Sequence, residues 1–547
     1  MTEQSGPIQK IAIVGGGTAG WLAAAVIAAH HKNATVSNSP ERNNSRERNN
    51  SPEQINSPER NNSQQQNRLE VTLVESSDIP TVGVGEGTWP TMKNTLKEIG
   101  IKESDMFAHC HAVFKQGGKF VNWVKGQGDF YYHPFTVPLG YGRIDLAPYV
   151  DKIEDYAVES NYQHHICEAN LAPRTISEGE YSGQCNYAYH LDAGAFAEML
   201  KNHCKNKLGV KHLIGTVDDV ALSADGSIAS VHLDNGKTIC ADLFIDCTGF
   251  QSLLLGKALG VKFKPMDKYL FNDSAMALHV PYEQDDSEIA SHTIATGQNA
   301  GWIWDIGLTS RRGVGHVYAS EYLSDDEAIQ NLRNYLRPSI GDKAEAIEPR
   351  KISFNSGHRE KWWHKNCVAI GMAAGFVEPL EATAIMLIEI SSRFVAENLP
   401  PNASIMPTIA KRFNQQMEYK WARIIDFLKL HYMLTKRPEP YWQAHTHPDS
   451  IPESLKEDLA IWGYRGPTHA DFESAVELFP AASYQYVLYG MGFKPDFSQQ
   501  SHLYNQQQQA DMIKQRNQTL TQQMLQRLPG HRAFIEQWLA ASRANRA

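Results

Sequence analysis

Three glycines near the N-terminus are spaced to bind a phosphate. Gly15, Gly17 and Gly20 follow the apolar residues 11–14 in the pattern Gly-x-Gly-x-x-Gly. Glycine permits a tight turn and lets a pyrophosphate approach the start of the next helix, where free N–H groups favour anions. The expected contacts to a dinucleotide are Gly15, Gly17, Thr18, Ala19 and Gly20. While the motif stands alone, a glycine turn without a ligand is the alternative.

An acidic residue that ends the second strand, about 20 positions further on, would bind the ribose. Glu75 follows Gly20 by 55 residues, but 35 of these form the polar segment 33–67, and without them the spacing is 20. That segment repeats a Ser-containing hexapeptide with almost no apolar side chain, so it can neither stack as a β-helix nor repay the entropy of ordering. We interpret 33–67 as a disordered loop inserted into a dinucleotide-binding fold, with a binding tail as the alternative.

Further glycine-rich segments follow other expected strands. Residues 83–88 read Gly-Val-Gly-Glu-Gly-Thr, Asp246 ends an apolar strand, and Gly371 begins another glycine-containing loop. Several such loops at strand ends suit a long cofactor, whereas NAD needs mainly the first. FAD therefore explains the set better than NAD. The additional expected contacts are Gly85, Glu86, Asp246 and Gly371.

Apolar strands alternate with helical periodicity along most of the chain. Strands are expected at 11–14, 71–75, 243–247 and 368–371, and helices at 21–30 and 380–399. This alternation is typical of an α/β fold with a parallel sheet. From 499 to 547 the chain is rich in Gln but keeps a helical spacing of apolar side chains, which predicts a C-terminal helix. We assign 1–400 to a cofactor-binding and catalytic domain and 401–547 to a mostly helical region that covers the substrate.

The overall composition is that of a globular protein and excludes several classes. The chain has 547 residues, 42% of them apolar, and its net charge of −9 gives no electrostatic reason to bind nucleic acid or an anionic membrane. Its seven cysteines are scattered without a Cys-x-x-Cys pair, so we expect neither a disulfide framework nor a metal site. Glycines interrupt the apolar stretch after residue 11, and no run of 18 apolar residues is present. We expect a cytoplasmic protein.

Several segments, in their order and separation, resemble the flavin-dependent tryptophan halogenases. They are Gly-Gly-Gly-Thr-Ala-Gly-Trp at 15–21, Gly-Val-Gly-Glu-Gly-Thr at 83–88, Phe-Lys at 114–115, Lys-Phe-Val-Asn-Trp at 119–123, Tyr-His-Pro-Phe at 132–135, Gly-Trp-Ile-Trp-Asp-Ile at 301–306 and Phe-Val-Glu-Pro-Leu-Glu-Ala-Thr at 376–383. The resemblance covers almost the whole chain outside 33–67. Its Trp-x-Trp and Glu-Pro-Leu-Glu segments are specific, whereas the glycine motif is shared by many dinucleotide-binding proteins.

The resemblance implies a fold and an activity. The fold would be the FAD-binding dinucleotide fold of flavin monooxygenases with an added, mostly helical substrate region. Reduced FAD, oxygen and a chloride or bromide ion would yield hypohalous acid, which halogenates an electron-rich aromatic, an indole or an indole-containing compound. A separate NAD(P)H-dependent flavin reductase would supply the reduced cofactor, because the chain has no second glycine fingerprint with an acidic partner. A homodimer is left open.

Lys115 and Glu381 align with the family's catalytic pair. A lysine in a dry pocket has a lowered pKa and can donate a proton or react as a free amine. Without the resemblance, Lys115 would be interpreted as a surface lysine in a helix. Glu381 would orient hypohalous acid and accept the proton that the ring loses. Pro379 is typical of a first helical residue, which would place Glu381 in the first turn, where a carboxylate is favoured in any case.

The same alignment implies a halide site and a barrier between flavin and substrate. The backbone N–H groups of Thr383 and Ala384 match the halide site, although the family usually has Gly in place of Ala384. Trp302 and Trp304 match the paired tryptophans that separate the flavin from the substrate. The family then continues Ile-Pro, whereas this chain has Ile-Gly at 306–307.

The substrate side departs most from the family. His133 and Phe135 match side chains that stack on the substrate ring, and their alternative role is that of ordinary core aromatics. Tryptophan-specific members clamp the amino-acid head group with a Tyr-Tyr and Glu-containing segment, and the corresponding region 471–492 contains no Tyr-Tyr pair. Because burying an unpaired zwitterion is costly, we expect an indole without that head group, or a larger indole-bearing molecule. The alternative functions are a flavin-dependent aromatic hydroxylase and a non-catalytic FAD-binding redox protein.

Overall fold

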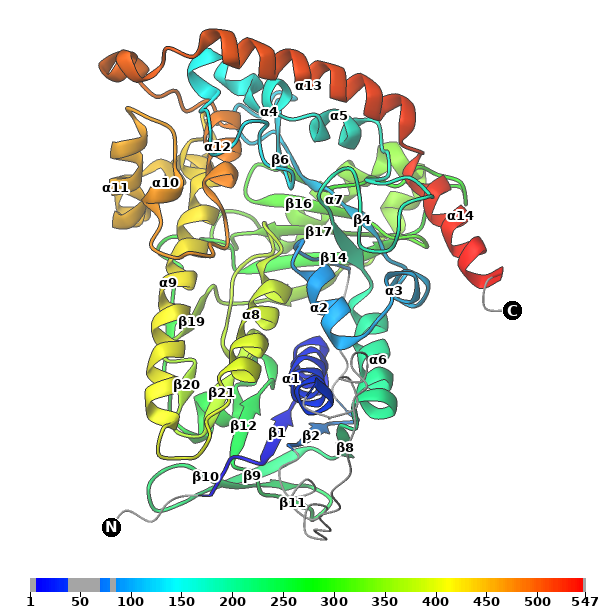
Figure 1. Ribbon diagram of the computed structural model, residues 1–547, viewed down its shortest axis with the longest axis vertical. Helices are drawn as coiled ribbons and strands as arrows, with labels where there is room; N and C mark the ends of the chain where they lie inside the picture. Colours follow the sequence, from blue (N-terminus) through cyan, green and yellow to red (C-terminus); the bar gives the residue numbers. More distant parts are fainter. Residues whose placement is uncertain (1–5, 38–68, 79–84, 545–547) are drawn as a thin grey trace, which may run out of the picture.

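The central sheet is the base on which the glycine motif lies. The computed structural model describes residues 6–37, 69–78 and 85–544 (Figure 1). The sheet has the order β20-β21-β12-β1-β2-β8, with parallel pairing from β21 to β8 and β20 antiparallel at one edge. Its strands are β1 (Lys10–Val14), β2 (Glu70–Glu75), β8 (Lys211–Ile214), β12 (Leu243–Asp246), β20 (Trp363–His364) and β21 (Cys367–Ala369). The predicted α/β fold with a parallel sheet is confirmed.

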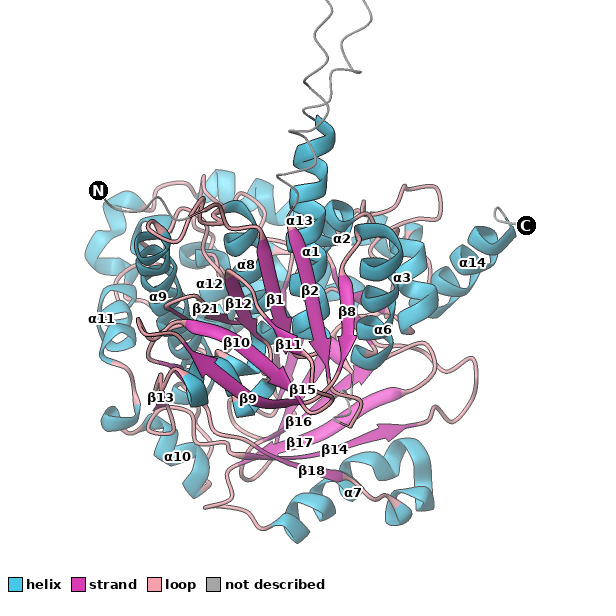
Figure 2. Cartoon of the chain, turned by 90° about the horizontal axis from the view of Figure 1, so that it is seen from below, coloured by secondary structure: helices cyan, strands magenta, loops and turns pink. Residues whose placement is uncertain are grey.

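Helix α1 (Thr18–Ser37) follows the glycine motif and lies along β1 and β2 (Figure 2). It is buried from residue 21 to residue 29 because α2 (Met92–Ile99), α6 (Ala193–His203) and α8 (Thr383–Glu397) pack against it. The helix is longer than the predicted 21–30. The prediction of a loop over 33–67 is therefore wrong for residues 33–37, which are helical, and residues 38–67 lie outside the described residues.

A second large sheet carries the paired tryptophans. It has the order β18-β14-β17-β16-β15-β5-β6 and is antiparallel except where β15 meets β5. Its strands are β5 (Gly117–Val121), β6 (Phe130–Pro134), β14 (Ser274–Val280), β15 (Thr293–Gly297), β16 (Trp302–Gly307), β17 (Arg312–Tyr318) and β18 (Arg350–Ser353). Helix α7 (Asp325–Ile340) packs against β17 and β14.

Three small sheets complete the β structure. The sheet of β3 (Glu86–Gly87), β7 (Ala188–Leu191) and β4 (Val113–Lys115) matters most here, because β4 leads through Gln116 into β5 of the second large sheet. The other two consist of β9 (Val217–Leu222), β10 (Ile228–Leu233) and β11 (Thr238–Ile239), and of β13 (Phe263–Pro265), β19 (Gly357–Arg359) and β22 (Gly375–Phe376).

After residue 405 the described chain is helical apart from its connecting loops (Figure 1). The helices are α9 (Met406–Met433), α10 (Pro440–Thr446), α11 (Glu453–Trp462), α12 (Ala481–Gly490), α13 (Gln507–Arg527) and α14 (His531–Ala544). Short helices α3 (Glu103–Cys110), α4 (Tyr156–Ser160) and α5 (Gln163–Glu168) precede them, and α13 packs on α4 and α5. The predicted C-terminal helix is present as α13 and α14. Within the described ranges, no helix is long and apolar enough to cross a membrane.

The turn between β1 and α1 requires glycine for two different reasons. Gly15 has a φ of 119°, and a Cβ there would lie 2.2 Å from the carbonyl oxygen of Cys247. A Cβ at Gly20 would lie 1.8 Å from the carbonyl oxygen of Gly15. At Gly17, by contrast, a Cβ would meet no atom within 4 Å. The first and third glycines thus close the turn, and the second faces open space at the start of α1.

Gly20→Ala and Gly17→Ala form a matched pair that separates these roles. Gly20→Ala places a methyl group against backbone, so we expect the melting temperature to fall by about 3 °C or more. Gly17→Ala is expected to leave the melting temperature of the FAD-free protein unchanged and to weaken FAD binding by about tenfold, or about 1.4 kcal/mol. Differential scanning fluorimetry and FAD titration measure both. Equal melting temperatures for the two variants would contradict the packing argument.

Candidate active site

Glu75 lies beside the glycine turn, at the carboxyl end of β2. A Cβ at Gly16 would be only 2.3 Å from its Cγ. Its Oε2 is 2.8 Å from Nε2 of His212 on β8, so the histidine orients the carboxylate. Sequence analysis did not find His212, because its position beside Glu75 depends on the pairing of β2 with β8.

Two further predicted cofactor residues shape loops around this turn. The buried carboxylate of Asp246 accepts hydrogen bonds from the backbone N–H groups of Leu254 (2.9 Å) and Leu255 (2.8 Å), so it organises the loop after β12. Gly371 has a φ of 72°, and a Cβ there would lie 2.7 Å from Cβ of Ala19. Glycine at this position therefore lets the loop after β21 close on the first turn of α1.

Gly85 and Glu86 lie at the start of the small sheet of β3, β7 and β4. Gly85 has a φ of 127°, which favours glycine, and Glu86 begins β3. Burial raises the pKa of the Glu86 carboxyl to about 7. Together with the open space at Gly17 and the free amides of α1, these loops fit a dinucleotide cofactor such as FAD.

Lys115 ends β4 and is buried, with 4% of its surface exposed. It is therefore not the surface lysine of a helix. Burial lowers the pKa of its ammonium group to about 8, against the opposing charge of Glu381. A Cβ at Gly87 would lie 3.1 Å from Lys115 Nζ and 3.2 Å from Cβ of Ala382, so both groups meet at this glycine. The ammonium group is also 5.2 Å from the ring centre of Phe135.

Glu381 is a buried carboxylate held between two histidines. Its Oε1 lies 3.0 Å from Nδ1 of His133 and 3.1 Å from Nε2 of His431. Burial alone would raise the pKa of this carboxyl, but the two histidines outweigh it and hold the pKa well below its usual range. The carbonyl oxygen of Glu381 accepts a 2.7 Å hydrogen bond from Nε1 of Trp89, which fixes the backbone as well.

The helix after Glu381 begins later than predicted. Pro379 is not its first residue, because α8 starts at Thr383 and Glu381 precedes the helix. Ala382 stands between them with a φ of 52°, in the left-handed region. The left-handed conformation of Ala382 turns the chain between Glu381 and α8. Glu381 is therefore followed almost directly in the chain by the first N–H groups of the helix, those of Thr383 and Ala384.

Trp302 and Trp304 lie on β16 and are both buried. Their ring centres are 6.4 Å apart with an interplanar angle of 62°. Nε1 of Trp302 donates a 2.8 Å hydrogen bond to Oε2 of Glu378. The ring of Trp304 occupies the place of a side chain at Gly315, where a Cβ would be 2.1 Å from Cη2. The tryptophans are therefore fixed by a carboxylate on one side and by a glycine on the other.

Four aromatic side chains form the aromatic cluster, and two of them, Trp89 and Phe427, contact the ring of His133. The four residues are Trp89, Phe135, Phe427 and Phe479. Trp89 contacts the rings of Phe135 and Phe479 at 5.3 and 5.2 Å, and Phe479 stacks on Phe427 at 3.9 Å. The structure thus brings both predicted stacking residues to Glu381, His133 by a direct contact and Phe135 through the cluster.

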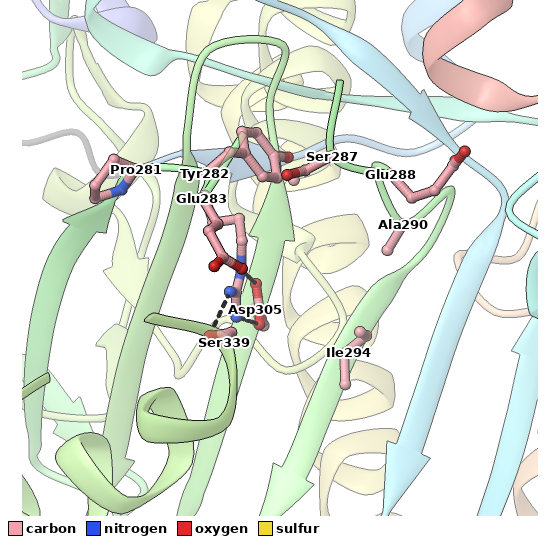
Figure 3. A pocket seen from close by; sticks show the side chains of 11 residues that line it. Pro281, Tyr282, Glu283, Ser287, Glu288, Ala290, Ile294, Asp305 and Ser339 are labelled. Carbon is pink, nitrogen blue, oxygen red and sulfur yellow. Dashed lines mark hydrogen bonds and ion pairs between the residues drawn. The ribbon is translucent and has the colours of Figure 1, made fainter. Parts of the chain in front are cut away.

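A separate cavity of about 350 Å³ opens at the far end of β16 (Figure 3). Asp305, Gly307 and Arg312 line it, together with Tyr282 and Ser339. Inside it, Arg312 pairs with Asp305 and donates a 3.0 Å hydrogen bond to Ser339. Its lining contains neither Lys115 nor Glu381. The cavity is therefore not the candidate active site.

Comparison with known proteins decides the family. Residues 60–507 match the tryptophan halogenase family model. The chain belongs to the tryptophan halogenase family. The tryptophan 7-halogenase RebH of Lentzea aerocolonigenes is 31% identical over 526 residues, 90% of this chain and 91% of its own. The 7-chloro-L-tryptophan 6-halogenase KtzR of Kutzneria sp. (strain 744) is 32% identical over 504 residues, 88% and 90% of the two chains.

A solved structure agrees with this assignment. The tryptophan halogenase of Shewanella frigidimarina NCIMB 400 is 42% identical, superposes with a TM-score of 0.86 and covers 98% of each chain. The chain is therefore a flavin-dependent halogenase, an oxidoreductase that uses FADH2 and halide. The expected family, activity and cofactors are confirmed. Halogenases of this family act on tryptophan-like aromatic substrates and rely on a separate flavin reductase.

Sequence analysis missed several residues that contact the predicted site residues. Trp89 directly follows the segment 83–88 and could have been included with it. Phe427 and His431 are four residues apart on α9, a spacing that places them on one helix face. Ser483 carries no such signal, because only the docking of α12 on β6 brings it to His133.

Gly87→Ala tests the meeting point of Lys115 and Ala382. The added methyl group would stand 3.1 Å from Lys115 Nζ and displace it, so we expect halogenation to fall by about tenfold or more. Product formation per minute with a saturating flavin reductase measures the effect. Gly179→Ala is the control, because a Cβ there meets no atom within 4 Å. Full activity of Gly87→Ala would show that the lysine tolerates displacement.

Proposed function

We propose that this enzyme halogenates a neutral indole, or a larger indole-bearing molecule, through Lys115 and Glu381. The observation that carries the proposal is that both side chains are buried, that the charge of Glu381 acts on Lys115, and that the ammonium group of Lys115 lies next to Phe135 of the aromatic cluster. Lys115 presents hypohalous acid to the ring. With a pKa of about 8, it is mostly an ammonium at neutral pH and becomes the free amine at higher pH.

The cofactor-binding residues are assigned from the family motifs, and the contacts of Glu75 and Gly371 with the glycine turn and the first turn of α1 support the assignment. We assign Gly15, Gly17, Thr18, Ala19, Gly20, Glu75, Gly85, Glu86, Asp246 and Gly371 to FAD. Bound FADH2 supplies, with oxygen, the oxidising power that converts halide into hypohalous acid. The first N–H groups of α8, at Thr383 and Ala384, hold the halide, because free helix-start amides favour anions. Trp302 and Trp304 separate the flavin from the substrate.

The indole preference rests on the polar groups of the region 471–492. Glu477, the carboxylate nearest to the aromatic residue Phe479 in sequence, accepts hydrogen bonds from the hydroxyl of Tyr419 (2.5 Å) and the N–H of Ser474 (3.1 Å). The carboxylate of Glu477 is thus already bound to α9 and to its own loop. An ammonium group in the pocket would lack this partner, whereas a flat neutral ring meets His133 and Phe135. We also propose that a homodimer is compatible with this activity.

Lys115→Ala and Glu381→Gln test the two roles. We expect Lys115→Ala to abolish halogenation with FAD affinity retained, because the lysine is not among the residues that we assign to FAD. Glu381→Gln should slow the reaction by about 10²-fold or more, as for a lost acid–base group. Product analysis by mass spectrometry with FAD, NADH, a flavin reductase and bromide measures both. Near-complete activity of Lys115→Ala, or less than about a threefold effect of Glu381→Gln, would refute the respective role.

A direct comparison of substrates tests the indole preference. We expect kcat/KM for indole to exceed that for tryptophan, because the zwitterion loses its water without gaining charged partners. Both substrates are measured with the same reductase, FAD and bromide supply. A tenfold advantage for tryptophan would mean that its head group is bound by residues outside the region 471–492.

A further inference from the structure

A second pocket, of about 360 Å³, lies between α2 and the segment that leads into β7. Its lining residues are Pro90, Thr91, Lys93, Asn94 and Lys97 on the side of α2, and Tyr181 and Asn186 on the other side. We call it the lysine pocket. Two of the lining residues are lysines and none is acidic, so its charge suits an anion.

The two lysines share one face of α2, because they are four residues apart. Lys93 is half-buried, and its Nζ lies 3.0 Å from Oδ1 of Asn186 and 4.3 Å from the ring centre of Tyr187. Lys97 is exposed, and its Nζ lies 5.2 Å from the ring centre of Tyr181. Each side chain is therefore held near the pocket by neutral groups.

Neither lysine has a carboxylate as its partner. Among the residues that the structure describes, no carboxylate forms an ion pair with Lys93 or Lys97, and Glu103, whose charge acts on Lys93, is itself paired with Arg174 at 2.9 Å. Burial, together with the charge of Lys97, lowers the pKa of Lys93 against the opposing charge of Glu103. A bound anion would compensate both ammonium groups.

Asn186 connects the lysine pocket to the aromatic cluster. Its Oδ1 accepts the hydrogen bond from Lys93, and its Nδ2 donates a 3.1 Å hydrogen bond to the carbonyl oxygen of Phe135. On the side of α2, Pro90 lines the pocket and directly follows Trp89 of the cluster. The lysine pocket is therefore next to two residues of the aromatic cluster.

The register of the small sheet places Lys115 near the same pocket. Lys115 on β4 is paired with Ala188 on β7, and Asn186 precedes Ala188 by two residues. Two residues of chain span about 7 Å at most. An alkyl chain of a few carbon atoms on a ring at the aromatic cluster is therefore long enough to bring an acid group to the lysine pocket.

We propose that the lysine pocket binds a carboxylate group of the substrate, and that the preferred substrate is therefore a larger indole-bearing molecule with an acid group on a flexible chain. This inference rests on the proposed function and selects the larger of its two substrate classes. The amide of Asn186 uses one N–H of Lys93, which leaves two donors for charge-assisted hydrogen bonds to the carboxylate.

The same two charges discriminate between substituents on one chain. An amide of the same length carries no charge, and an amine would meet two ammonium groups of its own sign and be repelled. A preference in the order acid, amide, amine therefore reports the two lysines. The apolar surface of the chain cannot produce this order, because all three compounds share it.

The test uses indole-3-acetic, indole-3-propionic and indole-3-butyric acids, each compared with its primary amide and with the corresponding amine. All are measured with the same reductase, FAD and bromide supply. At the chain length that reaches the pocket, we expect kcat/KM to fall in the order acid, amide, amine. The acid should exceed the amide by about fivefold or more, mainly through KM, because the acid group takes no part in the chemical step.

Lys93→Met/Lys97→Met removes both charges and keeps two long side chains. We expect the acid to lose its advantage in this variant, while kcat/KM for the amide and for indole changes by less than about twofold. Lys102→Met is the matched control, because Lys102 is an exposed lysine shortly after α2 that does not line the pocket, and it should retain the full preference.

Melting temperature identifies a folding defect. If the double variant does not fold, Lys97→Met at its exposed position decides, and it should lower the advantage of the acid by about twofold or more. A wild-type enzyme without an acid preference at any chain length, a preference that survives in the double variant, or an equal loss for acid and amide would overturn the inference, while halogenation of indole leaves the proposed function standing. A wild-type enzyme that halogenates neither indole nor any of the derivatives would refute the proposed function and the inference with it.

Discussion

The buried carboxylate of Glu381 is the interaction on which the architecture of the site depends. A carboxylate in a dry interior stays ionised only when donors compensate its lost hydration. Here His133 on β6 forms a hydrogen bond with the carboxylate, His431 on α9 adds a contact at 3.1 Å, and Trp89 holds the adjacent peptide. The C-terminal helices are thus part of the site, since without α9 the charge would lose one of its two partners.

Backbone geometry around the cofactor is a second constraint. At the start of α1, neighbouring backbone leaves no space for a Cβ at Gly15 or Gly20. Helix α8 packs directly on α1. Gly371 lies between the two helices, because a Cβ there would touch Ala19 and come within 3.8 Å of Ile388. Both helices therefore begin near this contact, and their free N-terminal amides are the groups that we propose for a pyrophosphate and for a halide.

The protein also keeps two carboxylates three residues apart in different roles. Glu378 accepts hydrogen bonds from the indole N–H of Trp302, from the side-chain amide of Asn272 (2.6 Å) and from the hydroxyl of Tyr432 (2.8 Å). It therefore anchors the tryptophan pair through Trp302. Glu381 faces the histidines. Since Tyr432 and His431 are neighbours on α9, one helix supports both carboxylates. The tryptophan pair and Glu381, to which we assign the barrier and the acid–base role, are therefore supported by the same element.

Local sequence determined the parts of this protein that depend on near neighbours. The glycine turn, the strands of the central sheet and the spacing to Glu75 follow from residue type and period, because each is set within one βαβ unit. The predicted start of the helix at Pro379 was wrong, because the conformation of a neighbouring residue prevailed over the preference of proline. Pro379 fits a helix start, but the left-handed Ala382 delays the helix to Thr383.

Only the tertiary structure decided which groups meet. His133 and Ser483 are 350 residues apart in the chain, and His133 and Glu381 are 248 residues apart. No periodicity encodes such contacts, because they arise when α12 docks against β6 and when side chains of α9 contact Tyr131 and His133 of β6. The sequence alone therefore predicted candidate reacting residues through family motifs, whereas the docked helices determine the hydrogen bonds and charges around those residues.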